Sequence, residues 1–130
     1  MKGAVPLAGY DGTQVFGAWT RGAAPNQEGI AVVGKSDRRS LEEAYKDFEL
    51  AATSNNMRIL ESKAQVLCHG TQQAWTMTIS GRTKGMQRDA IAVGVYVVKN
   101  GALYTLLYSA WAGATVDKSV TDFIDSFCAP

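Results

Sequence analysis

Two β-rich segments separated by Asn-Gly constrain the fold of this chain most strongly. Residues 91–98 are rich in valine, and residues 102–108 are rich in leucine and tyrosine. Asn100-Gly101 between them is typical of a type I′ turn, because both central residues of that turn need positive φ. The sequence therefore predicts an antiparallel hairpin. Its expected register pairs Lys99 with Ala102, Val97 with Tyr104, Val95 with Leu106 and Val93 with Tyr108.

Both faces of this hairpin are apolar. The valines at odd positions share one face, while the other face carries Tyr96, Leu103 and Leu107 together with small residues. An antiparallel sheet with one face in water would show polar residues on that face. The hairpin is thus expected to be central in its sheet, with other elements covering both sides.

Two amphipathic helices are expected. In the sequence, one precedes a run of four consecutive strands and the other follows it. Ser40 and Glu43 form a capping-box pattern, after which apolar residues recur at helical spacing up to Ala52. Apolar residues at i, i+4, i+7, i+8 and i+11 over 116–127 predict the second helix. Asp117 falls in its first turn or at its cap, where a carboxylate suits the positive helix end.

The remaining segments with β character complete an α+β fold. Strands are expected over 14–20, 30–34, 57–67 and 75–80, and the last of these is expected to bury Trp75, Met77 and Ile79. Successive strands without intervening helices imply antiparallel neighbours. The 130 residues are fewer than the roughly 150 that serve as a prior for one domain, so we expect a single domain over 1–130.

Composition excludes several classes of function. Hydrophobic residues make up 46% and charged residues 19%, as in a globular domain. A net charge of +1 provides no field to attract DNA or RNA, so no nucleic-acid partner is expected. No apolar stretch approaches the roughly 20 residues of a membrane span. Residues 1–6 do not lead into a signal peptide, which predicts a cytoplasmic protein, or an exported one if a signal has been removed.

The chain has two cysteines and one histidine, which offer little chemistry. Cys68 and Cys128 lie far apart in the sequence, and with His69 they do not form a cluster of metal ligands, so neither a metal nor a cofactor is expected. Two free thiols are favoured over one disulfide, although the redox compartment decides this. Adjacent strand residues point to opposite faces, so a buried Cys68 beside an exposed His69 is favoured over a nucleophilic dyad.

Two sets of residues are candidate binding sites. Arg82, Lys84 and Arg88 form a basic loop between two strands, which could bind a phosphate or an acidic surface. Solvated charge at a hairpin tip is the simpler interpretation. Tyr96, Val98, Leu103 and Leu107 would form an exposed patch for a partner if the helices left part of the hairpin uncovered. Trp111 is a further candidate, because the alternation does not place it inside and tryptophan is enriched at interfaces. Burial of that hairpin face under a helix is favoured.

The hairpin over 96–109, followed by a helix that ends Phe-Ile-Asp-Ser-Phe at 123–127, resembles the PsbP-like domains. This is the fold shared by PsbP and the Ran-binding Mog proteins, and many small bacterial members have no known function. The likeness covers about residues 28–128, and the helix that follows Ser40 fits the same order of elements. The resemblance implies a central antiparallel sheet with helices on both faces, an α/β/α sandwich. It also implies a noncatalytic module, because the family shares no catalytic motif.

The sequence thus predicts a noncatalytic binding or interaction module. Its partner would be another protein, a second copy in a homodimer, or a small ligand. We expect no catalytic residues, and the binding residues would come from Arg82, Lys84, Arg88, Tyr96, Leu103 and Trp111. The alternatives are an anion-binding protein that uses the basic loop, or a small enzyme that uses Cys68.

Overall fold

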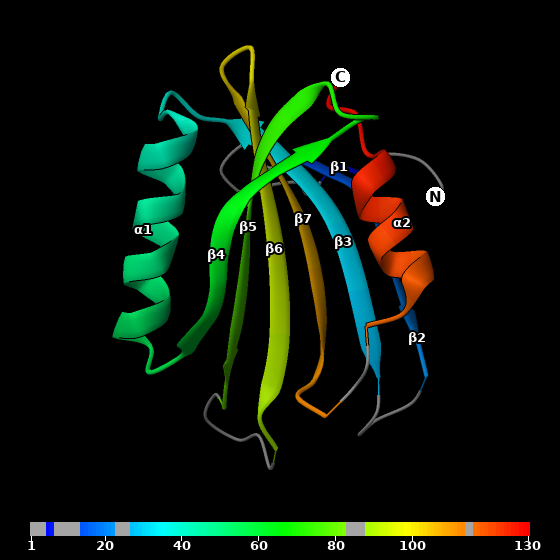
Figure 1. Cartoon of the computed structure of the whole chain (residues 1–130). Coiled ribbons are helices and arrows are strands. Elements are labelled where there is room, and N and C mark those ends of the chain that lie inside the picture. Colours follow the sequence, from blue (N-terminus) through cyan, green and yellow to red (C-terminus); the bar gives the residue numbers. More distant parts are fainter. Residues whose placement is uncertain (1–4, 7–13, 23–26, 83–87, 114–115) are drawn as a thin grey trace.

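The computed structural model describes residues 5–6, 14–22, 27–82, 88–113 and 116–130. These residues form one antiparallel sheet and two helices (Figure 1). The sheet order is β1-β2-β3-β7-β6-β5-β4. In chain order the elements are β1 (Val5–Pro6), β2 (Gln14–Arg21), β3 (Glu28–Ser36), α1 (Leu41–Ser54), β4 (Arg58–Leu67), β5 (Gln72–Gly81), β6 (Ala90–Lys99), β7 (Ala102–Trp111) and α2 (Lys118–Ser126).

The predicted hairpin is the pair β6–β7, which lies inside the sheet with β5 on one side and β3 on the other. Its register is as expected, with Lys99 opposite Ala102 and Val95 opposite Leu106. Asn100 and Gly101 have φ of 52° and 74°, the left-handed conformations that a type I′ turn requires. The prediction of a central hairpin is confirmed.

Both helices begin where the sequence predicts. At α1, Ser40 Oγ accepts from the Glu43 amide at 3.1 Å, and Glu43 Oε1 accepts from the Ser40 amide at 3.1 Å. At α2, Asp117 caps the first turn, since its Oδ1 accepts from the Ser119 amide at 2.9 Å. Among the described residues, neither helix is long and apolar enough to cross a membrane.

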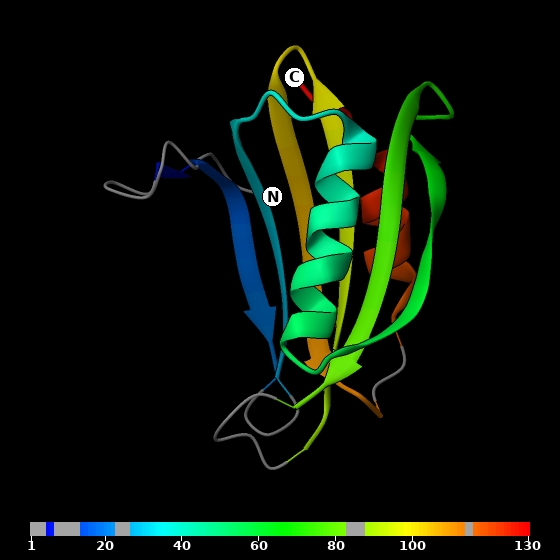
Figure 2. The same ribbon diagram turned by 90° about the vertical axis from the view of Figure 1, so that its left-hand side faces the viewer.

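The two helices contact different residues of the strands. On α1's side lie Trp75 and Tyr96, whereas Ile124 of α2 joins a buried cluster with Val95. Neighbouring residues of a strand point to opposite faces, and Figure 2 shows α1 in front of the sheet with α2 behind it. The α+β class and the antiparallel sheet are confirmed. Coverage is incomplete, because Leu107 on the α1 side stays 43% exposed.

The preference for free thiols is wrong. Cys68 and Cys128 form a disulfide whose Cα atoms are 4.7 Å apart. The turn between β4 and β5 places Cys68 beside the end of α2, where the Cys68 amide donates to the Asp125 carbonyl oxygen at 3.0 Å. The chain then continues directly to Cys128. The pairing depends on the path of α2 across the sheet, which two cysteines 60 residues apart do not reveal.

Candidate functional site

A cavity of about 480 Å³ lies between α2 and the part of the sheet formed by β4–β7, and we call it the α2 cavity. Its three sides come from different elements. The β4 wall consists of Glu61, Lys63, Ala64 and Gln65; the floor consists of Thr76, Thr78, Val93, Val95 and Tyr108; and the α2 side consists of Val116, Val120, Thr121, Ile124 and Asp125.

Strand register brings the floor residues together. Thr76 lies opposite Val95, and Thr78 lies opposite Val93, so two hydroxyls and two valines share one face. The Tyr108 ring completes the floor and is 2% exposed. Its hydroxyl donates to the Glu28 carboxylate on β3, away from the cavity. The floor is therefore apolar on the β6–β7 side and carries hydroxyls on the β5 side.

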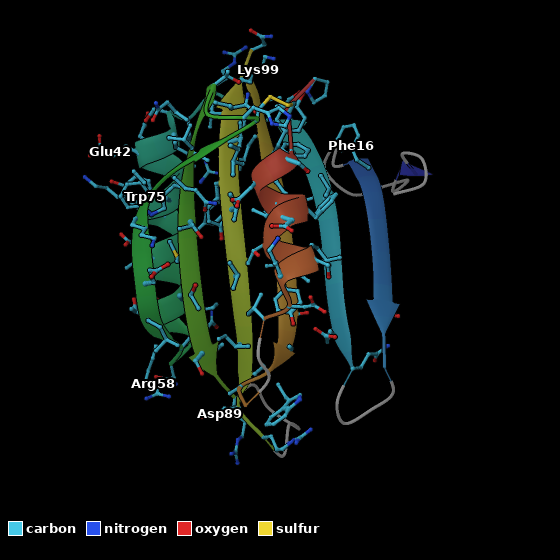
Figure 3. The ribbon with its side chains drawn as sticks, turned by 45° about the vertical axis from the view of Figure 1, so that its right-hand side comes forward. Phe16, Glu42, Arg58, Trp75, Asp89 and Lys99 are labelled. Atoms are coloured by element: carbon cyan, nitrogen blue, oxygen red, sulfur yellow. A yellow bond between two sulfur atoms is a disulfide. The ribbon has the colours of Figure 1, made fainter. Side chains whose placement is uncertain are left out.

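The C-terminal end of α2 is fixed to the sheet by several bonds. Gln65 Nε2 donates to Asp125 Oδ1 at 3.0 Å, and the Asp125 carbonyl oxygen accepts from the Cys68 amide. The disulfide lies beyond them; Figure 3 draws it as a yellow bond near the C-terminal end of α2. Next, the Ala129 amide donates to Gln72 Oε1 at 2.9 Å. These bonds join the C-terminal end of α2, and the residues after it, to β4, β5 and the turn between them.

The charged groups at the α2 cavity lie at its edge. Lys63 Nζ is 3.5 Å from Glu61 Oε1, and these side chains are 61% and 48% exposed. Asp125 receives the hydrogen bond from Gln65. The deeper floor is uncharged, so the arrangement suits an uncharged or weakly polar molecule rather than acid–base chemistry.

The predicted basic loop makes contacts within the chain. Arg82 Nε is 3.2 Å from Asp89 Oδ1. The Arg88 guanidinium carbon lies 4.6 Å from the centre of the Trp111 ring, a cation–π contact. Lys84 lies outside the described residues. Two of the three predicted cations thus have partners already, and an anion would have to compete with Asp89 and Trp111.

Tyr96 and Leu103 are packing residues on the α1 side. The Tyr96 ring stacks on Phe48 of α1 with centroids 4.6 Å apart, and burial raises the pKa of the Tyr96 hydroxyl. Leu103 is 2% exposed. Trp111 lies at the far end of β7 with Arg88, so the predicted binding residues do not form one site.

A second hollow, of about 370 Å³, lies on the α1 side of the sheet. It is lined mainly by apolar residues, including Met57, Met77 and Leu107. Gly94 in its floor leaves room for the Tyr96 side chain, because a Cβ at Gly94 would lie 2.3 Å from the Tyr96 hydroxyl oxygen. We call this the α1 hollow.

The sequence did not identify the α2 cavity. Its one signal lay in β5, where Thr76, Thr78 and Ser80 alternate with Trp75, Met77 and Ile79. The apolar set was expected to be the buried one. In the structure Thr76 and Ser80 are also buried, at 5% and 3% exposure. Hydroxyls on a covered face indicate a space or a polar partner, and that face is the one under α2.

Comparisons with known proteins give a fold but no family. No family model and no curated protein matches this chain. Among solved structures, the chain is similar to PA94 from Pseudomonas aeruginosa, a protein of unknown function that has been suggested to be a regulator. The TM-score is 0.67 at 10% identity, covering 95% of this chain and 87% of that one. At this identity the likeness concerns the fold alone.

Proposed function

We propose that this protein is a noncatalytic binding module that holds a small amphipathic ligand in the α2 cavity. The observation that carries the proposal is the cavity itself, about 480 Å³ between a tethered helix and a mixed floor. Known ligand pockets span about 300–1,000 Å³ and combine an apolar lining with a few polar groups. The valines and threonines of the floor have this composition.

We also propose that the fold is of the PsbP-like kind, with one helix on each face of the sheet. The resemblance of residues 96–109 and 123–127 to that family supports this, as do the separate contacts of α1 and α2. A noncatalytic function agrees with the family resemblance. The name of the similar Pseudomonas protein suggests regulation, and ligand binding would suit such a function.

The two alternative functions have less support. A nucleophilic enzyme would need a Cys68 thiolate, but that sulfur is bonded to Cys128. Anion binding by the basic loop would have to displace the contacts of Arg82 with Asp89 and of Arg88 with Trp111.

A second candidate function is binding of a protein partner, or of a second copy in a homodimer, on the α1 side. The observation in its favour is Leu107, which is 43% exposed beside the α1 hollow. Covering an exposed leucine of this kind would favour association.

Titration with N-phenyl-1-naphthylamine, an uncharged dye that fluoresces in apolar sites, tests the proposed site. V120F places a ring in the α2 cavity, whereas L107E alters the opposite side of the sheet. We expect V120F to abolish the dye signal and L107E to retain it, with circular dichroism confirming that both variants fold. Loss of the signal in L107E alone would instead place binding at the α1 hollow. A native mass spectrum would show whether the purified protein is a dimer or carries a noncovalent adduct.

A further inference from the structure

Thr76 is the most buried of the threonines that line the α2 cavity. The residue is 5% exposed, and within the described part of the chain its hydroxyl has no hydrogen-bond partner. Every fully buried polar side-chain atom of the described residues does have a partner. The Thr76 hydroxyl is therefore not fully enclosed, and the space it reaches is the cavity that the residue lines.

The surroundings of this hydroxyl are apolar. Val95 lies directly opposite Thr76 in the neighbouring strand, and Val93 lies further along the floor. Val120 and Ile124 face them from α2 across the cavity. A ligand group placed here loses contact with water and must find its hydrogen bond at Thr76.

A charged ligand group is disfavoured beside the Thr76 hydroxyl, where an uncharged one fits. Lys63 is the cation that lines the cavity within the described residues, and it is 61% exposed and paired with Glu61. Asp125 on the α2 side accepts from Gln65. A carboxylate or an ammonium moved to the floor beside Thr76 would lose its hydration, and the charged groups of the cavity lie at its edge rather than in the floor.

We infer that the ligand is an uncharged amphipathic molecule with an apolar body and one hydroxyl or carbonyl oxygen, which pairs with the Thr76 hydroxyl. Threonine can donate to a carbonyl oxygen, or accept from a hydroxyl, so both groups fit. The apolar body lies between the valines of the floor and Val120 and Ile124 of α2. This inference rests on the proposed function, because it names the ligand class of the same cavity.

The test compares n-octanol, octanoate and octylamine, which share one apolar chain and differ in the polar end. Binding is followed by methyl NMR shifts of Val93, Val120 and Ile124 in the full-length protein with its disulfide intact. We expect n-octanol to bind at least about fivefold more tightly than either charged analogue.

Three variants examine the role of Thr76. T76V removes the hydroxyl at constant shape and should weaken n-octanol binding about threefold to tenfold, the effect of one hydrogen bond. T76S keeps a hydroxyl and should bind n-octanol within about twofold of the parent protein. T105V is the matched control, since Thr105 lies in β7 beside Leu106 and points away from the cavity, and it should leave binding unchanged.

The outcomes separate the inference from the proposed function. If none of the three compounds shifts the cavity methyls, the proposed function itself fails. If octanoate or octylamine binds as tightly as n-octanol, the cavity remains a binding site but its ligand is not an uncharged molecule. If T76V binds n-octanol as well as the parent does, the assignment to Thr76 is overturned. The ligand comparison uses the parent protein and does not depend on the folding of any variant.

Discussion

The two helices cover the same sheet by different means. α1 is held by two aromatic side chains near its middle: Tyr45 stacks on Trp75 with centroids 3.7 Å apart, and Phe48 stacks on Tyr96. α2 instead packs on the buried cluster through Ile124 and Val120, and its C-terminal end is fixed by the disulfide and by the bonds of Asp125. Stacking brings a helix close to a sheet, whereas fixing one end allows a space beneath it. The larger cavity accordingly lies under α2.

Polar bonds reinforce the stacking under α1. Trp75 Nε1 donates to Ser62 Oγ at 2.8 Å, and Ser62 Oγ donates to Glu49 Oε2 at 2.7 Å. This chain of bonds links β5, the edge strand β4 and the helix. α1 is thus expected to unfold with the sheet, and α2 is expected to depend on its fixed end.

Among the changes that test how differently the two helices are held, removing the disulfide should lower stability most. Cys68→Ser with Cys128→Ser opens a loop of 60 residues, and the chain-entropy model gives a loss of about 4 kcal/mol in the free energy of unfolding. Urea denaturation measures the total. Hydrogen exchange should show lost protection in α2 while α1 keeps most of its own. Equal loss of protection in both helices would mean that they form one cooperative unit and would end the contrast.

Truncating the aromatic contact of α1 should have the next largest effect. Phe48→Ala removes the ring that stacks on Tyr96, and for a half-buried ring we expect a loss of about 2–3 kcal/mol. Leu50→Ala is the matched control on the same helix, because Leu50 is 66% exposed, and it should change stability by less than about 0.5 kcal/mol. Thermal denaturation followed by circular dichroism distinguishes the two. If Phe48→Ala lowered stability as little as Leu50→Ala, stacking would not be what holds α1 on the sheet.

Protonation of Asp37 should loosen the start of α1 at low pH. Its carboxylate accepts from the Arg39 amide at 2.9 Å and from Arg39 Nε at 3.0 Å, and the Arg39 guanidinium lowers the Asp37 pKa to about 2. Because the folded pKa lies below the ordinary value of 3.8, the carboxylate stabilises the fold above about pH 4. This contribution falls as the pH drops towards 2.

Asp37→Asn should therefore lower stability by about 1.5 kcal/mol at neutral pH. The difference from the parent should shrink steadily as the pH falls from about 4 through the folded pKa of about 2, as measured by urea denaturation across that range. Asp122→Asn is the control on α2, because its pair with Lys118 is exposed and screened by solvent, so its effect on stability should be much smaller. A constant Asp37 difference at every pH would show that the charge is not the cause.

Local signals in the sequence were sufficient for most of the fold. The Asn100-Gly101 turn fixed the register of the hairpin, and the Ser40 and Asp117 caps marked the starts of the helices, since each depends on residues within a few positions. The two-residue strand β1 was missed because so short an edge carries no pattern.

The candidate site depended on long-range geometry and could not be predicted in the same way. The α2 cavity exists because α2 lies above Thr76 and Val95, residues far from it in the sequence, and the Cys68–Cys128 bond that joins the end of this helix to the sheet is equally long-range. Residues chosen for their chemistry, such as Arg82 and Tyr96, turned out to have partners within the chain. Buried threonine hydroxyls were a usable signal, but only after the covered face was known.

Removing the helix caps should have the smallest effect on stability, and it compares α1 with α2 most directly. Ser40→Ala and Asp117→Ala each remove one hydrogen bond to a first-turn amide, with an intrinsic effect of about 1 kcal/mol. Because α1 is packed against the sheet, Ser40→Ala should lower the global free energy of unfolding by that amount. Asp117→Ala should mainly lower hydrogen-exchange protection within α2, and the global urea midpoint should change less. If both substitutions moved the midpoint equally, α2 would be as firmly part of the cooperative core as α1.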